Sequence, residues 1–144
     1  MIEFDFRFHA DRSGCTGTQY FELTPGPYRS AHWVPGARFI DEYTFCLFEG
    51  IFEKRVPDYD HFAYVDVLRP QWKLIMADLS ALCERLLRAE NDVVDLPYGS
   101  TLRVEHDFAL DVANKHRLAT LISELQEWLG EKSGDHDCIS VLGL

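Results

Sequence analysis

The sequence predicts a single α+β domain over residues 1–144, with two to three helices packed on one face of a mostly antiparallel sheet. Three observations predict this fold. Residues 62–87 run from a short strand directly into a helix. Residues 1–9 alternate apolar and polar side chains, and residues 138–144 are nearly all apolar. Strands and helices do not alternate strictly along the chain, as a doubly wound fold would require.

The segment 62–87 is the clearest element of the chain. Aromatic and β-branched residues in its first part favour a strand. Pro70 then lies where the first turn of a helix tolerates proline, because its missing N–H would have no helical partner there. The apolar residues that follow recur at intervals of three and four, which predicts one buried helical stripe. The stripe comprises Trp72, Ile75, Met76, Leu79, Leu82, Cys83, Leu86 and Leu87.

The N-terminal part predicts a β-hairpin over residues 1–24. In residues 1–9 every second side chain is apolar, which favours a strand with one buried and one solvated face. Residues 11–17 are rich in glycine and serine, as in a turn, and 18–23 favour a second strand. Three prolines in residues 24–36 then predict an irregular connection.

Residues 41–54 favour a helix, although strand-forming residues in 39–48 leave a strand as the alternative. Gly50 weakens such a helix by about 1 kcal/mol relative to alanine. A short strand is expected at 101–104.

The C-terminal part predicts a helix followed by a strand. Apolar residues at helical spacing favour a last helix over 112–130. Its expected N-cap is Asp111 or Asn114, and its expected C-cap is Gly130. We expect residues 139–142 to form a strand inside the sheet, because so apolar a chain end would otherwise lie in water.

The net charge of −10 argues against nucleic acid as a direct ligand, because such binding relies on lysine and arginine. Half of this charge falls in residues 90–112. It forms either a solvated acidic loop or a surface complementary to a basic partner.

The chain has no apolar run of the length that a membrane span needs, and its first residues do not resemble a signal peptide. Its four cysteines are widely spaced and form no C-x-x-C pair, which favours reduced thiols. A cytoplasmic protein is therefore expected.

Motifs of metal or covalent chemistry are weak in this sequence. None of the six histidines forms an H-x-x-x-H pair, and residues 135–138 alone cannot close a zinc site. Cys15, in the glycine-rich loop, would need a histidine base such as His9, His61 or His106 beside it. The paired acids of the chain lie in polar loops, where solvated carboxylates are the expected state. We therefore predict no catalytic residue, no metal and no cofactor.

Three tyrosines lie beside acidic residues: Tyr59, Tyr64 and Tyr98. Tyrosine among carboxylates is typical of a patch that binds a basic protein, because the ring anchors the partner while the charges steer it. The alternative is that these rings only cover the edge of the core.

Three stretches of the chain resemble small bacterial immunity proteins, the cytoplasmic antidotes to polymorphic or contact-dependent growth inhibition toxins. The stretches are the strand and W-x-x-I-M-x-x-L helix of 64–87, the D-L-P-Y-G turn at 95–99 with the helix of 114–129, and the terminal I-S-V-L-G-L of 139–144. The resemblance implies a protein that is not an enzyme. It implies that the chain binds a cognate toxin and blocks its active site or docking surface. Many such toxins are basic nucleases, whose polyanionic substrate an acidic inhibitor would mimic.

The functional hypothesis is thus an acidic immunity-type protein, a monomer or weak dimer, whose partner is a cognate toxin. The predicted contact residues are Asp92, Asp95, Tyr98, Glu105, Asp107, Asp111, Asp58 and Asp60. One alternative is a small enzyme or ligand-binding domain that contains cysteine and histidine and uses a pocket between helices and sheet. Another is a structural subunit that pairs through a sheet edge.

Overall fold

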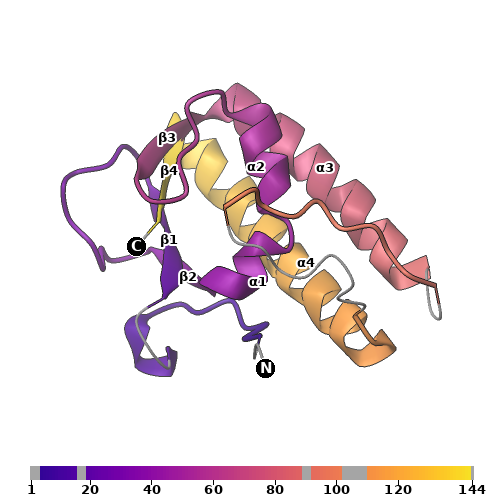
Figure 1. The fold of residues 1–144 in the computed structure, drawn as a ribbon. Helices are drawn as coiled ribbons and strands as arrows, with labels where there is room; N and C mark the ends of the chain where they lie inside the picture. Colours follow the sequence, from indigo (N-terminus) through magenta and orange to yellow (C-terminus); the bar gives the residue numbers. More distant parts are fainter. Residues whose placement is uncertain (1–3, 16–18, 89–91, 102–109, 144) are drawn as a thin grey trace.

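The computed structural model describes residues 4–15, 19–88, 92–101 and 110–143, and these residues form a four-stranded antiparallel sheet beside four α-helices (Figure 1). The elements are the 3-10 turn Arg12–Gly14, β1 (Tyr20–Pro25), β2 (Arg38–Asp41), α1 (Glu42–Cys46), α2 (Glu49–Arg55), β3 (Tyr64–Leu68), α3 (Arg69–Arg88), α4 (Val112–Asp135) and β4 (Cys138–Leu142). The strand order is β2-β1-β4-β3. The predicted α+β class is confirmed.

The C-terminal strand lies in the middle of the sheet, as its apolar sequence predicts. β4 pairs with β1 on one side and β3 on the other, with Val141 opposite both Leu23 and Val65. All five residues of β4 are buried. The last segment of the chain therefore joins the other three strands into one sheet.

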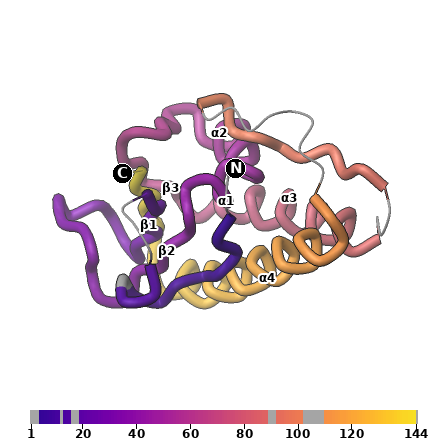
Figure 2. Tube along the Cα trace, turned by 60° about the horizontal axis from the view of Figure 1, so that its bottom comes forward, coloured from indigo at the N-terminus to yellow at the C-terminus, as the bar shows by residue number. Residues whose placement is uncertain are grey.

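The strand-to-helix unit at 62–87 is confirmed. β3 passes directly into α3, and the buried residues of α3 follow the predicted spacing: Trp72, Ile75, Leu79, Leu82 and Leu86. Met76 and Cys83 are half-buried beside this core, whereas Leu87 is exposed. The long helices α3 and α4 run side by side in both views (Figures 1 and 2).

The two faces of the sheet are covered differently. Phe21 and Leu23 of β1 belong to the core beneath the helices. On the opposite face, Tyr20 packs against Phe39 and the segment that precedes β2. Buried Glu22 also points to this face, and its carboxylate accepts the backbone N–H of Trp33 at 3.0 Å. The irregular connection predicted at 24–36 is therefore a cover for the second face.

The predicted strand at the N-terminus is wrong for the residues described. Residues 4–8 form no strand ladder, and pairing begins with a single bridge between His9 and Phe39. The apolar side chains of this segment are nevertheless half-buried against the core, and Phe8 meets Trp128 edge to face at 6.1 Å. The alternation thus reflects an extended segment that packs by its side chains without pairing its backbone.

The helix expected at 41–54 is present but broken. Leu47 and Phe48 separate α1 from α2, and strand-forming residues just before α1 form β2, which the prediction missed. Asp41 ends β2 and caps α1, because its carboxylate accepts the N–H of Thr44 at 3.1 Å. Gly50 is required by packing: a Cβ there would lie 2.7 Å from the carbonyl oxygen of Pro97.

The last helix begins where the sequence predicts but ends later. Asp111 caps α4 by accepting the N–H of Asn114 at 2.7 Å. The predicted C-cap at Gly130 is wrong, since the helix continues to Asp135, and among the described glycines those with positive φ are Gly26 and Gly36. Most of the strand expected at 101–104 lies outside the described residues. No helix in the described ranges has an apolar stretch long enough to cross a membrane.

Candidate partner-binding surface

The structure distributes the predicted contact residues over several places. Asp58 and Asp60 lie together at a cleft, whereas Asp92 and Asp95 line a separate hollow. Asp111 is the N-cap of α4. Glu105 and Asp107 lie outside the described residues.

The first of these places is an acidic cleft of about 470 Å³ between α2, the loop that leads to β3, and the end of the 92–101 segment. We define the acidic cleft by Glu53, Asp58 and Asp60, with Ser100 and Thr101 opposite. Asp58 and Asp60 are exposed. Glu53 connects α2 to the opposite side of the cleft, since its carboxylate accepts the backbone N–H of Ser100 at 2.7 Å. Three carboxylates therefore surround one opening.

A buried polar cluster lies beneath the acidic cleft. The imidazole of His61 bridges two carboxylates, with Nδ1 2.7 Å from Oε2 of Glu49 and Nε2 2.8 Å from Oε1 of Glu42. Tyr59 donates its hydroxyl to the same oxygen of Glu49 at 2.5 Å. These bonds join the loop that carries Asp58 and Asp60 to both α1 and α2. The loop is therefore fixed before any partner arrives.

Burial and hydrogen bonding together determine the protonation of this cluster. Burial raises the pKa of Glu49 above its usual value, although hydrogen bonds from Tyr59 and His61 oppose the rise. Among the described residues no hydrogen bond reaches its second oxygen, Oε1. For His61, burial lowers the pKa, but the bonds to Glu42 and Glu49 outweigh it and leave the pKa raised. The cluster therefore retains protons that the unfolded chain would release.

This cluster should make stability fall as pH rises. A histidine with a raised folded-state pKa stabilises fully below its unfolded pKa of 6.5 and loses that contribution as pH passes the folded value. The raised pKa of Glu49 acts in the same direction. We expect the free energy of unfolding to decline as the pH rises above 6.5, and to decline less in the Glu49→Gln/His61→Gln variant. Urea titrations at several pH values measure both slopes, and equal slopes would contradict the role of the cluster.

The aromatic residues near the acidic cleft have different roles from those expected. Tyr59 is held by Glu49, and Tyr98 is half-buried against the core. Phe62 and Tyr64, which follow the acidic loop, are 69% and 54% exposed. The exposed rings next to the acidic loop are therefore those of Phe62 and Tyr64, and the Tyr64 ring also stacks on the ring of Tyr28 at a centroid distance of 4.1 Å. Of the three tyrosines singled out from the sequence, Tyr64 is the exposed one.

Asp92 and Asp95 lie at the other end of the 92–101 segment. They line a hollow of about 390 Å³ together with Arg85 and Arg88 of α3. The guanidinium of Arg85 donates to the carbonyl oxygen of Asp95 at 3.2 Å, and the ammonium of Lys115 donates to that of Asp92. Because cations accompany these acids, their neighbourhood is of mixed charge, unlike the acidic cleft.

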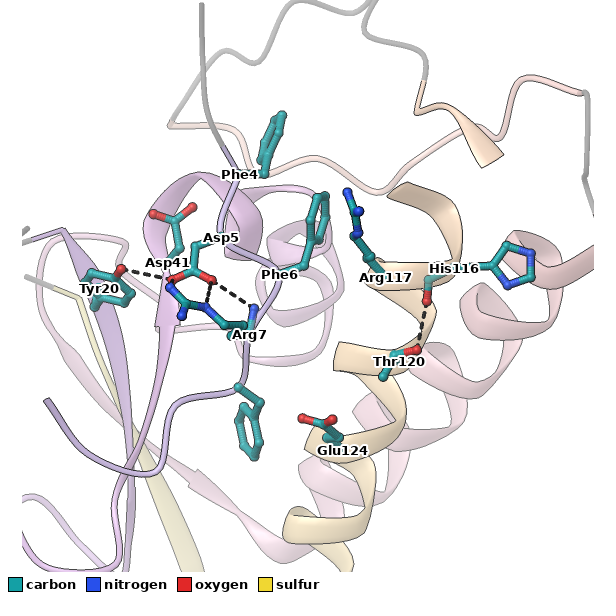
Figure 3. Close-up of a pocket in the computed structure, with 11 residues that line it drawn as sticks. Phe4, Asp5, Phe6, Arg7, Tyr20, Asp41, His116, Arg117, Thr120 and Glu124 are labelled. Carbon is teal, nitrogen blue, oxygen red and sulfur yellow. Dashed lines mark hydrogen bonds and ion pairs between the residues drawn. The ribbon is translucent and has the colours of Figure 1, made fainter. Parts of the chain in front are cut away.

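A cavity of about 970 Å³ lies between the N-terminal segment and α4 (Figure 3). One wall carries Asp5, which binds Arg7 and accepts the hydroxyl of Tyr20 at 3.1 Å. Burial alone would raise the pKa of Asp5, but bonds from Arg7 and His9 outweigh it and lower the pKa to about 2. Burial raises the pKa of Asp41 in the same cavity. The cavity thus contains two carboxylates whose proton affinities differ.

Three side chains that could take part in acid–base or nucleophilic chemistry are His116, His9 and Cys15. In Figure 3 the imidazole of His116 points away from Asp5 and Asp41. His9 is bonded to Asp5 at 2.6 Å, and the Sγ of Cys15 donates to the carbonyl oxygen of Asp11 at 3.8 Å. The four cysteines, all within the described ranges, are thiols. No group of three or more potential metal ligands occurs among the described residues.

Comparisons of the chain with protein-family models, curated proteins and solved structures find no match. The geometry therefore carries the functional argument. Sequence reasoning missed the cluster of Glu42, Glu49 and His61. One signal was available: Glu42 and Glu49 are seven residues apart, on the helical face that also carries Phe45 and Phe52.

Proposed function

We propose that this chain is a cytoplasmic immunity-type protein that binds and neutralises a basic toxin domain through the acidic cleft. The observation that carries the proposal is the fixed position of the exposed acids Asp58 and Asp60 beside the exposed ring of Phe62. Carboxylates attract a basic partner from a distance, and an aromatic side chain supplies contact area once it arrives.

The rigidity of the acidic cleft also supports this proposal. The loop that carries the acids is bonded through His61 to α1 and α2, so little conformational entropy is lost when a partner binds. A basic nuclease would meet carboxylates at positions that its polyanionic substrate occupies. Inhibition would then follow from occlusion of the toxin's active site or docking surface.

A ligand-binding role is the second candidate, and the cavity between the N-terminal segment and α4 favours it. Its volume of about 970 Å³ suits a small organic ligand, and Phe4 and Phe6 supply apolar walls. A catalytic role for this cavity has less support than ligand binding, because the imidazole of His116 points away from Asp5 and Asp41.

Co-expression with the product of the gene immediately upstream tests the immunity function. That product, or its C-terminal domain, should arrest growth when expressed alone, and co-expression of this chain should restore growth. A product that is harmless, or one whose toxicity is unchanged by this chain, would contradict the proposal. An unrelated basic toxin, which should not be neutralised, is the control for specificity.

A further inference from the structure

We propose that the partner of this chain adds an extended basic segment to the outer edge of β3, as a fifth strand of the sheet. The inference rests on the proposed function in one respect, namely that the chain binds a basic protein. It adds where that protein docks and how its backbone is recognised.

The backbone of β3 presents hydrogen-bonding groups on its outer side. Two bonds define which residues face β4: Gly143 donates its N–H to Ala63 at 2.9 Å, and Arg69 donates its N–H to Asp137 at 3.1 Å. Backbone groups alternate along a strand, so the odd-numbered residues of β3 face β4. The N–H and C=O groups of Tyr64 and Asp66 therefore point outward.

These outward groups are available. No hydrogen bond from the described part of the chain reaches the backbone of Tyr64 or Asp66. The outward N–H of Leu68 has a local acceptor, since it donates to Oε1 of Gln71 at 2.9 Å. The open edge thus comprises the first half of β3, next to the acidic cleft.

The opposite edge of the sheet is closed. Phe39 of β2 exchanges two backbone bonds with His9, with N···O distances of 2.9 and 3.0 Å. The N-terminal segment therefore protects β2 from further pairing. Exposed edges are usually blunted in this way because they template association, so an edge left open at β3 is consistent with a binding role.

The side chains along β3 select the chemistry of the added strand. Val65 and Val67 are buried under the helices, whereas Tyr64, Asp66 and Leu68 are exposed on the other face. An added strand would place every second side chain beside Tyr64 and Asp66.

The charges around this edge favour a basic strand over a second copy of the chain. Asp58 and Asp60 precede β3, and Asp66 lies within it. One carboxylate oxygen of Asp66 accepts the hydroxyl of Ser140 at 2.6 Å and the N–H of Tyr28 at 3.0 Å. Of these three described acids, Asp58 and Asp60 are therefore the ones without such a contact to the loop before β2. The nearest cation in sequence, Arg69, is turned toward the end of α4, where it donates to the carbonyl oxygen of Ser133 at 2.8 Å. Two copies would bring their acids together, each copy with a net charge of −10. Like charges opposite one another destabilise strand pairing.

A synthetic peptide of about seven alternating lysine and valine residues tests the edge directly on the full chain. In NMR spectra, the peptide should shift the backbone amide resonances of Tyr64 and Asp66. It should also protect these two amides from hydrogen exchange. An acidic peptide in which glutamate replaces lysine should not bind.

Two N-methylated forms of this peptide separate strand addition from simple charge attraction. In an added strand, every second amide of the peptide faces β3, so these amides belong either to all the lysines or to all the valines. Methylation of the set that faces β3 should block binding. Methylation of the other set should leave binding unchanged. Loss of two hydrogen bonds raises Kd about tenfold or more. Equal binding of the two forms, or protection outside β3, would overturn the proposal.

A substitution in the chain itself gives an independent test. Tyr64→Pro removes an outward N–H without touching the bonds to β4, and proline is tolerated on edge strands for that reason. It should weaken peptide binding about fivefold relative to the matched Tyr64→Val, which also lacks the aromatic ring but keeps the N–H. If Tyr64→Pro fails to fold, the two methylated peptides still decide the question.

Two further outcomes would overturn the inference. A dimer of the chain alone, with protection confined to β3, would assign the edge to a second copy. Growth rescue in the co-expression test by a chain whose edge does not bind the peptide would leave the immunity function standing and place the contact elsewhere.

Discussion

Gly143→Ala should lower the free energy of unfolding by about 3 kcal/mol or more. A Cβ at this position would overlap the carbonyl oxygen of His61 and lie 3.3 Å from the ring of Phe21. The backbones cannot separate easily, because Gly143 also donates its N–H to Ala63 at 2.9 Å. Urea unfolding followed by circular dichroism measures the change.

Gly130→Ala is the matched control with the opposite sign. Gly130 is exposed in the interior of α4, and nothing lies within 4 Å of an added Cβ. Alanine is favoured over glycine in a helix by up to about 1 kcal/mol, so this variant should be more stable than the wild-type chain. If both alanines changed stability by the same amount, the close packing of Gly143 on His61 would be refuted.

Reversal of two charges at the acidic cleft, Asp58→Lys with Asp60→Lys, should reduce the rate of association with the toxin at least tenfold. Both side chains are exposed, so the fold should survive. Stopped-flow measurement gives the association rate constant, and circular dichroism verifies the fold.

The control for this prediction is Glu127→Lys with Glu131→Lys on the exposed face of α4. It changes the net charge of the chain by the same amount. Its association rate should fall much less, because these residues lie away from the acidic cleft. An equal fall in both double variants would mean that net charge, and no particular surface, steers the partner.

Elements with a regular pattern of buried residues could be predicted from the sequence. The helical spacing of apolar residues from Trp72 to Leu86 and the apolar sequence of the C-terminal strand both indicate directly which side chains are buried. Residues 4–8 misled because alternation shows which side chains are buried but not whether the backbone is paired. Gly130 misled because an exposed glycine can also lie in the middle of a helix, as here, where an added Cβ would have no atom within 4 Å.

The candidate surface could be predicted only in part. Asp58 and Asp60 were expected as exposed acids because prolines, tyrosines and acids predict a wet loop. The hydrogen bonds that connect this loop to α1 and α2 could not be predicted. They join His61 to Glu42 and Glu49, which lie 19 and 12 residues away in the sequence. The open edge of β3 depends on the strand order, which pairs the C-terminal strand with β1 near the N-terminus and with β3 in the middle of the chain.

If fixed acids at the cleft steer a basic toxin domain onto this chain, the rate of association must depend on ionic strength. The most direct test is the association rate constant of the wild-type chain with the upstream gene product, measured at ionic strengths of about 0.01 M and about 1 M. We predict a steep fall at the higher ionic strength, and a much weaker dependence in the Asp58→Lys/Asp60→Lys variant. A wild-type rate constant that is the same at both ionic strengths would contradict steering by these acids.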